Sequence, residues 1–366
     1  MAPVRVLVAP SAFGGTLTAV EAGEAIAAGW LRRAPGDVVT CVPMSDGGSG
    51  FVDVLAASLG GELVAVAAHD PYGTAVPATI LVTDGTAYVE SAQACGVHLS
   101  DRRDGEHASS FGVGELVAAT LDCRVHRLVV GLGDTGTNDA GAGLLAALGA
   151  TSRPEDVLRR GPEALERLES VDVGAVRRRL AGIEVVIASD VDIPLLGLRG
   201  VTNAHGARVG IADDRLMAVD GQLSRLADAT DRRLADAKGA GAGGGIGFAL
   251  MLLAARRVDG VEVVSEAVGL PELARSADLV VTGEGSFDFS SRSGKVPYGV
   301  AAVAGAAIRP CIALAGEVLI GSREMRSLGI ESAYSVVDLV GREAAIGEPA
   351  KSLSALAERV ARSWSR

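Results

Sequence analysis

Lysine is scarce in this sequence. Among 34 basic residues only Lys238, Lys295 and Lys351 are lysine, and the 45 acidic residues give a formal net charge of −11. Such an excess of negative charge repels a nucleic-acid backbone instead of neutralising it. Nucleic acid is therefore not expected as a partner, and a lysine in an unusual context attracts attention.

Long apolar runs are also absent. No run reaches the roughly 18 residues needed to cross a bilayer, and the first ten residues lack the apolar core and cleavage site of a signal peptide. The four cysteines and five histidines are scattered, with no pair at metal-ligand or redox spacing. We therefore expect a cytoplasmic protein with no membrane partner.

Glycine, by contrast, is abundant, with 48 of 366 residues, nearly twice the roughly 7% of average usage. Such an excess points to many loops. The length suggests two domains or one large one, and a hydrophobic content of 48% is ample for a core.

Both ends of the chain alternate between short apolar runs and helical periodicity, the pattern of an α/β sheet. Strands are predicted at Val4–Ala9, Val38–Pro43, Asp278–Thr282, Cys311–Ala315 and Ala333–Val337. The middle of the chain has a different texture, with hairpin-like strands from Leu63 to Glu90 and helical patterns at Pro154–Leu180, Asp213–Ala235 and Phe248–Arg256. We predict a doubly wound parallel-sheet domain from residues 1–66 plus 276–366, with a second α/β domain, 67–275, inserted and an active site in the cleft between them.

Polar or glycine-rich sequence follows six of the apolar runs. Because ligands of open α/β sheets bind beyond the carboxyl ends of the strands, these segments are where function is expected. Backbone N–H groups at glycines suit phosphate, and carboxylates in the same loops suit Mg²⁺. Phosphoryl transfer is the chemistry that uses both. The segments are Ser11–Thr16, Ser45–Gly50, Gly131–Asp139, Ser189–Asp192, Gly239–Gly247 and Gly283–Lys295.

The short motifs taken singly are weak. Gly131–Gly136 matches G-x-G-x-x-G after a strand, which leaves a nicotinamide-dependent oxidoreductase open, but no clear ribose-binding acid follows a second strand. No G-x-x-x-x-G-K-[ST] motif occurs, which excludes a P-loop nucleotide-hydrolysing enzyme. Lys295 precedes Val296-Pro297, a helix start that places its ammonium group beside free N–H groups, although a surface lysine explains it equally well.

Several acids also have two explanations. Asp190 and Asp192 stand two apart after a strand, so in extended backbone they share a face and could hold a cation or a hydroxyl proton; alternatively they cap a turn. Asp46, before two glycines, favours a turn. Glu284 and Asp288 near Lys295 suggest a site, with solvated surface acids as the alternative.

Taken in order, these segments resemble the type 1 glycerate kinase family. The matching segments are Ala9-Pro10, Met44-Ser45-Asp46-Gly47-Gly48, Thr137-Asn138-Asp139-Ala140-Gly141-Ala142-Gly143, Asp190-Val191-Asp192, Thr282-Gly283-Glu284-Gly285 and Gly294-Lys295. The resemblance implies a flavodoxin-like domain interrupted by a second α/β domain. It also implies phosphorylation of D-glycerate that depends on ATP and Mg²⁺.

The chain departs from the family pattern at ligand-facing positions. Pro10-Ser11-Ala12-Phe13-Gly14-Gly15 stands where the family usually has Pro-Asp-Ser-Phe-Lys-Gly, and Ser286 stands where Arg usually follows Gly-Glu-Gly. Ile193 replaces Asn in Asp-Val-Asp-Asn-Pro, and His205–Gly210 replaces Phe-Gly-Pro-Gln-Lys-Gly, with Arg208 one position from the lost Lys. A diverged member that binds ligands without catalysis is therefore the alternative function.

The resemblance implies the following roles. Asp190 and Lys295 are the expected catalytic residues, and Asp190 and Glu284 the expected Mg²⁺ ligands. ATP is expected at Gly133, Thr137, Asn138, Gly283, Glu284, Gly285 and Lys295. The hydroxy-acid substrate is expected at Ser11, Phe13, Asp46, Asp192 and Arg208. A homo-oligomer stays possible.

Overall fold

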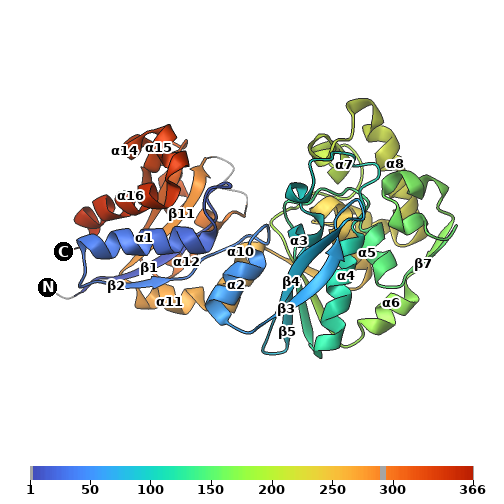
Figure 1. The fold of residues 1–366 in the computed structure, drawn as a ribbon, viewed down its shortest axis with the longest axis horizontal. Helices are drawn as coiled ribbons and strands as arrows, with labels where there is room; N and C mark the ends of the chain where they lie inside the picture. Colours follow the sequence, from blue (N-terminus) through green and yellow to red (C-terminus); the bar gives the residue numbers. More distant parts are fainter. Residues whose placement is uncertain (1–2, 289–293, 366) are drawn as a thin grey trace. The chain divides into compact units, whose positions relative to one another are not determined.

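The computed structural model describes residues 3–288 and 294–365. Contacts divide the chain into two compact units (Figure 1). Unit 1 comprises residues 1–46, 53–60 and 259–366, and unit 2 comprises 47–52 and 61–258. The domain limits expected from the sequence stay a prediction; they are residues 1–66 with 276–366 for one domain and 67–275 for the other. Within the described ranges, no helix has the length and apolar character needed to span a membrane.

Unit 1 is built on a five-stranded parallel sheet in the order β13-β12-β11-β1-β2. In chain order within the unit this is the 2-1-3-4-5 arrangement of flavodoxin-like folds. Two strands come from the front of the chain and three from the back, as the alternation predicted. The strands are β1 (Arg5–Pro10), β2 (Val38–Cys41), β11 (Leu279–Phe287), β12 (Cys311–Val318) and β13 (Ser332–Ser335).

Helices cover both faces of this sheet (Figure 1). Val6 and Val8 of β1 pack in one buried cluster with Ile26 and Trp30 of α1 and with residues of α16, whereas Leu7, between the two valines, is buried outside that cluster. This alternation is the two-residue period of a strand buried on both sides. The helices of the unit are α1 (Ala19–Arg33), α2 (Phe51–Leu59), α10 (Gly260–Ala267), α11 (Leu270–Ser276), α12 (Val296–Ala306), α13 (Ser322–Ser327), α14 (Val336–Val340), α15 (Arg342–Gly347) and α16 (Pro349–Trp364).

Unit 2 contains a six-stranded sheet in the order β10-β9-β6-β5-β4-β3. The first four strands are mutually parallel, and the β5-β4-β3 meander is antiparallel. The strands are β3 (Glu62–His69), β4 (Ala75–Thr83), β5 (Thr86–Glu90), β6 (Arg127–Gly131), β9 (Glu184–Ala188) and β10 (Arg256–Val258), beside a separate hairpin of β7 (Thr151–Arg153) and β8 (Ser170–Asp172). Its α-helices are α3 (Ala92–Cys95), α4 (Phe111–Thr120), α5 (Ala142–Ala147), α6 (Gly174–Arg179), α7 (Val201–His205), α8 (Leu216–Ala229) and α9 (Ile246–Leu252).

Three helical predictions in unit 2 were wrong in extent. Pro154–Leu180 contains two 3-10 turns, Val157–Arg159 and Pro162–Arg167, then β8 and α6, because Gly161 at φ 78 and Pro162 interrupt the helical pattern. Asp213–Ala235 divides into 3-10 turns at Asp213–Arg215 and Arg232–Asp236 around α8. After α9 the chain forms β10, which pairs with β9 where a helix was expected up to Arg256.

Two predicted segments of unit 1 also differ. The Gly283-Glu284-Gly285 segment lies within β11 instead of in a loop, because pairing with β12 continues as far as Phe287 opposite Val318. Cross-strand pairing here overrides the low strand propensity of glycine. At the other end, β13 stops at Ser335, whose Oγ accepts a hydrogen bond from Asp338 N and begins α14.

Candidate active site

A pocket of about 100 Å³ lies in unit 2 beyond the carboxyl ends of β6 and β9. Its walls come from the loop after β6, the loop after β9, the glycine-rich segment before α9, and α7 with the 3-10 turn that follows it. Glycine contributes backbone with no side chain to much of the wall. The lining residues are Leu132, Gly133, Asp134, Thr135, Thr137, Asn138, Val191, Val201, His205, Arg208, Val209, Gly241, Gly243 and Gly244.

Two of these glycines permit the close approach of separate loops. Gly244 has φ +70, and a Cβ at this position would lie 1.8 Å from the carbonyl oxygen of Thr137. A Cβ at Gly133 would lie 2.6 Å from Cα of Gly48. Only glycine fits such positions without displacing the backbone. The glycine excess noticed in the sequence therefore serves loop packing around this pocket.

The Thr137-Asn138-Asp139 segment is buried, and two of its side chains are held by neighbours. Asn138 Nδ2 donates to Thr202 Oγ1 at 3.0 Å. Asp139 accepts from Ser110 N and Oγ, Gly141 N and Gly143 N, at 2.8–3.1 Å. Burial raises the pKa of Asp139, and these hydrogen bonds oppose the rise. Asp139 therefore joins the starts of α4 and α5 and has a structural role.

Thr137 differs from these two residues. Its hydroxyl is buried, and in the described part of the chain Oγ1 makes no hydrogen bond to a nitrogen or oxygen atom. The Cys95 thiol, a weak hydrogen-bonding group, is its polar neighbour. A buried hydroxyl that lines a pocket without a strong partner is suited to bind a ligand oxygen.

Arg208 reaches the pocket from the 3-10 turn Gly206–Val209 and forms an ion pair with Asp134 at 3.0 Å. Burial raises the pKa of Asp134, but hydrogen bonds from Arg208 and Ser49 outweigh it and hold the pKa below its usual value. His205 also lines the pocket, and desolvation together with the charge of Arg208 lowers its pKa. The pocket thus presents a guanidinium group and an imidazole whose pKa lies below its ordinary value.

Asp190 and Asp192 follow β9 but do not line the pocket; Val191 between them does. Asp192 is exposed and forms ion pairs with Arg257 at 2.8 Å and Lys238 at 3.6 Å. Asp190 is partly buried and stands directly after Ser189. The prediction that the two carboxylates share one face stays a prediction.

The other predicted site residues belong to unit 1. Ser11 N and Oγ donate to the carbonyl oxygen of Gly283 at 2.8 and 3.2 Å, and the buried ring of Phe13 lies against Gly283. These residues and Gly285 therefore meet where β1 and β11 run side by side. Asp46 is partly buried and Glu284 is buried.

Lys295 occupies the N-cap position of α12, with Pro297 in the first turn, so the predicted helix start is confirmed. Part of the segment before it, residues 289–293, lies outside the described residues.

Four predicted residues line the pocket (Gly133, Thr137, Asn138, Arg208), and five lie where β1 and β11 run side by side (Ser11, Phe13, Gly283, Glu284, Gly285). Asp46, Asp190, Asp192 and Lys295 belong to neither group. Sequence reasoning gave no role to Asp134 or His205. The Arg208 partner was not detectable because 74 residues separate it from Asp134. Among the described residues no group of three or more His, Cys, Asp or Glu could hold a metal. Mg²⁺ needs only one or two protein oxygens when phosphate supplies others, so its predicted ligands stay a prediction.

Comparison with known proteins gives a consistent result. Residues 6–365 match the model of the glycerate kinase family. A Bacillus subtilis glycerate kinase is 36% identical over 91% of this chain and 90% of its own length. An Escherichia coli glycerate 2-kinase is 33% identical over 92% of each chain, and an uncharacterized Mycobacterium bovis protein, Mb2228c, is 38% identical over 98% of this chain and 91% of its own.

Structural comparison agrees. A crystal structure of a protein assigned as glycerate kinase 2 in Salmonella typhimurium LT2 has a TM-score of 0.84 and 31% identity, and the match covers 99% of this chain and 98% of that one. The chain belongs to the glycerate kinase family.

Proposed function

We propose that this protein is an ATP-dependent kinase that phosphorylates a hydroxyl group of D-glycerate or a similar small hydroxy acid, as a type 1 member of its family. One observation carries the proposal. The pocket brings the glycine-rich backbone, the Arg208 guanidinium and the buried Thr137 hydroxyl, which has no partner stronger than the Cys95 thiol among the described residues, together in one site. Such a donor set suits phosphate and carboxylate oxygens. The names of the relatives support glycerate as the acceptor.

Each predicted residue keeps a role in this proposal. Gly133, Thr137 and Asn138 would hold nucleotide phosphates, and Arg208 would bind the acceptor carboxylate, for which guanidinium is well shaped. Asp190 would orient or deprotonate the attacking hydroxyl. Lys295, at the start of α12, would add positive charge beside the transferred group.

The remaining predicted residues are in unit 1, apart from Asp192. Gly283, Glu284 and Gly285 would contribute to nucleotide binding, and Ser11, Phe13, Asp46 and Asp192 to acceptor binding. Of these, Phe13 is buried in the core of unit 1, and Asp192 forms an ion pair with Arg257.

The carboxylates of Asp190 and Glu284 have the oxygen donors that Mg²⁺ prefers, so they are the proposed ligands. The ion would neutralise charge on the nucleotide phosphates. A cytoplasmic location also belongs to the proposal.

Two observations favour a second candidate, a diverged member that binds ligands without catalysis. Arg208 is already paired with Asp134, and the first loop has Ser11 and Gly14 where the family pattern has Asp and Lys. Each lost charge-assisted hydrogen bond is worth about 1.5–3 kcal/mol. Such losses would weaken binding of an acceptor more than binding of a nucleotide.

A coupled assay of ADP release tests the two candidates. The purified protein is supplied with Mg·ATP and with D-glycerate or a panel of short hydroxy acids. We expect release with D-glycerate and its loss in Lys295→Ala. Lys351→Ala is a matched control because Lys351 is exposed on α16 and forms an ion pair with Glu348. ADP release with another acid alone would mean that this acid is the acceptor. Nucleotide binding without ADP release for any acid would favour the non-catalytic protein.

A further inference from the structure

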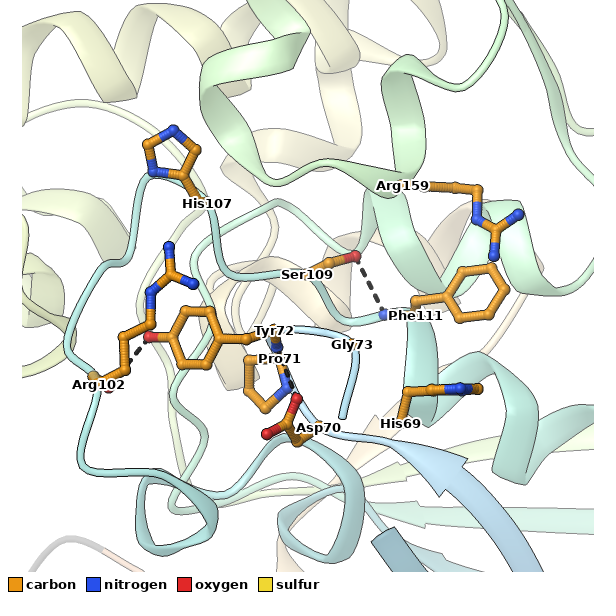
Figure 2. A pocket seen from close by; sticks show the side chains of 10 residues that line it. All are labelled: His69, Asp70, Pro71, Tyr72, Gly73, Arg102, His107, Ser109, Phe111 and Arg159. Atoms are coloured by element: carbon orange, nitrogen blue, oxygen red, sulfur yellow. Dashed lines mark hydrogen bonds between the residues drawn. The ribbon is translucent and has the colours of Figure 1, made fainter. Parts of the chain in front are cut away.

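A second pocket, of about 330 Å³, lies in unit 2 and shares no lining residue with the first (Figure 2). The turn between β3 and β4 and the start of α4 form its floor, and the segment 102–109 and the end of the 3-10 turn Val157–Arg159 form its sides. Its volume falls within the range of small-molecule sites. The lining residues are His69, Asp70, Pro71, Tyr72, Gly73, Arg102, His107, Ser109, Phe111 and Arg159.

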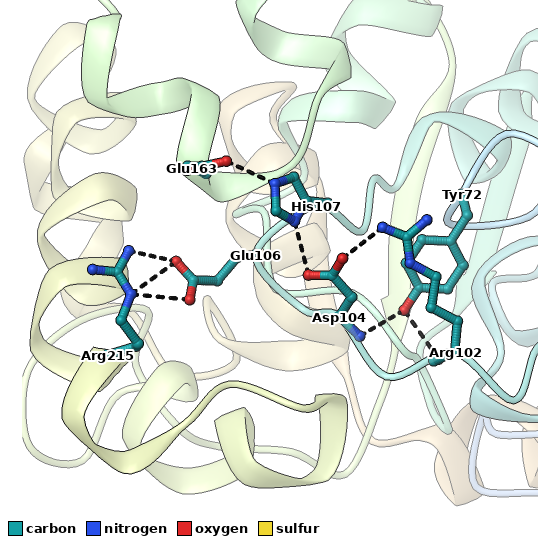
Figure 3. A network of polar contacts seen from close by, with 7 residues as sticks. All are labelled: Tyr72, Arg102, Asp104, Glu106, His107, Glu163 and Arg215. Carbon is teal, nitrogen blue, oxygen red and sulfur yellow. Dashed lines mark hydrogen bonds and ion pairs between the residues drawn. The ribbon is translucent and has the colours of Figure 1, made fainter.

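Basic side chains stand on two sides of this pocket. Figure 2 shows Arg102 and His107 on one side and Arg159 and His69 on the other. On the first side, acidic side chains of the protein pair with these basic groups (Figure 3). Asp104 accepts from Arg102 at 2.5 Å and from His107 Nδ1 at 2.8 Å, while Glu163 contacts His107 Nε2 at 2.7 Å.

This chain of ion pairs fixes the wall of the pocket instead of offering charge to a ligand. Tyr72 contributes too, because its hydroxyl donates to the Arg102 carbonyl and accepts from Asp104 N, both at 3.1 Å. Nearby, Glu106 binds Arg215 at 2.6 Å and ties the same segment to the chain before α8. The wall is therefore already formed without a ligand.

Arg159 is different. Its guanidinium lies 4.1 Å from the centre of the Phe111 ring, and within the described residues it forms no ion pair. Stacking on the ring holds the plane of the guanidinium and leaves its N–H edge available to an anion. His69 stands on the same side, with Nδ1 bound to Glu115 at 2.9 Å, which orients the ring; Nε2 makes no hydrogen bond in the described part of the chain.

The floor offers groups for hydroxyls. Asp70 is 6% exposed, and its Oδ1 accepts from Tyr72 N and Thr74 N at 2.9 and 2.8 Å. Its Oδ2 makes no hydrogen bond among the described residues, so it can accept one from a ligand hydroxyl. Ser109 Oγ accepts from Phe111 N at 3.3 Å and keeps its proton as a donor. An uncompensated cation and an acceptor thus face the same small volume.

We propose that this pocket is a second binding site, for a small hydroxylated anion such as a hydroxy carboxylate or its phosphate ester. Arg159 binds the anionic group, and Asp70 Oδ2 and His69 Nε2 accept hydrogen bonds from hydroxyl groups, since the His69 proton lies on Nδ1 toward Glu115. None of these residues takes part in the proposed phosphoryl transfer, so the site goes beyond that function. A bound ligand here would contact four separate segments of unit 2.

Histidine NMR tests this site in the full chain, because the five histidines report separately on the two pockets. His69 and His107 line the second pocket, and His205 lines the first. Inorganic phosphate, D-glycerate and 3-phospho-D-glycerate are titrated in turn, with signals assigned by single His→Gln variants. We expect a saturable shift of the His69 signal with 3-phospho-D-glycerate or D-glycerate.

Arg159→Ala should raise the Kd measured on the His69 signal at least about tenfold, because a charge-assisted hydrogen bond is lost. Arg160→Ala is the matched control: it is the adjacent exposed arginine and does not line the pocket. Equal Kd values in these two variants, or shifts confined to His205, would overturn the proposal. Binding of inorganic phosphate as tight as that of 3-phospho-D-glycerate would overturn the role of the hydroxyl. The outcome does not depend on kinase turnover.

Discussion

The guanidinium of Arg208 lies 3.0 Å from the carboxylate of Asp134, and Asp134 accepts a second hydrogen bond from Ser49 Oγ at 3.0 Å. Both partners of the ion pair are about half exposed, at 51% and 45%. Exposed ion pairs contribute little to stability, about 0–1 kcal/mol. The pair therefore matters for where it holds Arg208, at the edge of the pocket.

Asp134→Asn should leave the free energy of unfolding within about 1 kcal/mol of the wild type. It should raise KM for the hydroxy acid about tenfold, because Arg208 loses the partner that orients it. Steady-state kinetics and urea unfolding measure the two effects. Asp278→Asn is the control, since it removes an arginine ion pair of similar exposure between Arg5 and Asp278. A KM change of the same size in both variants would contradict a positioning role for Asp134.

Thr137→Val should weaken ADP binding without destabilising the protein. The substitution removes a buried hydroxyl that has no strong partner in the described structure. The free energy of unfolding should therefore change little. Calorimetric titration with ADP and urea unfolding provide the two measurements. Thr120→Val is the contrasting variant, because Thr120 Oγ1 donates to Val117 O at 2.7 Å and its loss should cost about 1 kcal/mol. Unchanged ADP affinity in Thr137→Val would remove the hydroxyl from the nucleotide site.

Asp190→Asn should reduce turnover about 10²–10⁴-fold, the range expected for loss of a general base. The fold should persist, as circular dichroism and urea unfolding would show. Asp213→Asn provides the control, since Asp213 is exposed in the 3-10 turn before α8. Wild-type turnover in Asp190→Asn would eliminate its proposed role.

The His107 contacts predict a pH dependence of stability. The hydrogen bond with Asp104 raises the pKa of His107 above its ordinary value of 6.5, and the charges of Asp104 and Glu163 add to the rise, against the effect of burial. A raised folded-state pKa means that the stabilisation is fully present below pH 6.5 and is lost as pH rises through the folded value. The difference in unfolding free energy between wild type and His107→Gln should therefore be largest at about pH 5.5 and shrink by about pH 9.

Urea unfolding at several pH values measures this difference. His98→Gln is a suitable reference, because His98 takes part in no ion pair among the described residues. A difference in unfolding free energy between wild type and His107→Gln that grew with rising pH would mean that folding does not raise the pKa of His107.

Much of the architecture could be predicted because its signals are local. Val6 and Val8 alternate with equally apolar neighbours, and such a short continuous apolar run is typical of a strand buried on both sides. Thr18 and Glu21 form a capping box at the start of α1. Shorter elements could not be predicted, because their few residues carry no local pattern of their own. The three residues of β10 form a strand only because β9 lies beside them.

The sequence alone determined the α/β alternation, the front-and-back origin of the unit 1 sheet, the position of the polar loops and the family resemblance, since all of these are carried by neighbouring residues. Tertiary structure decided which loops meet. Gly244 contacts Thr137, and Arg208 forms an ion pair with Asp134, only because strand order and register bring distant segments to one edge of a sheet. Such contacts depend on long-range pairing and on loop backbones that only glycine can adopt, and no local pattern specifies them.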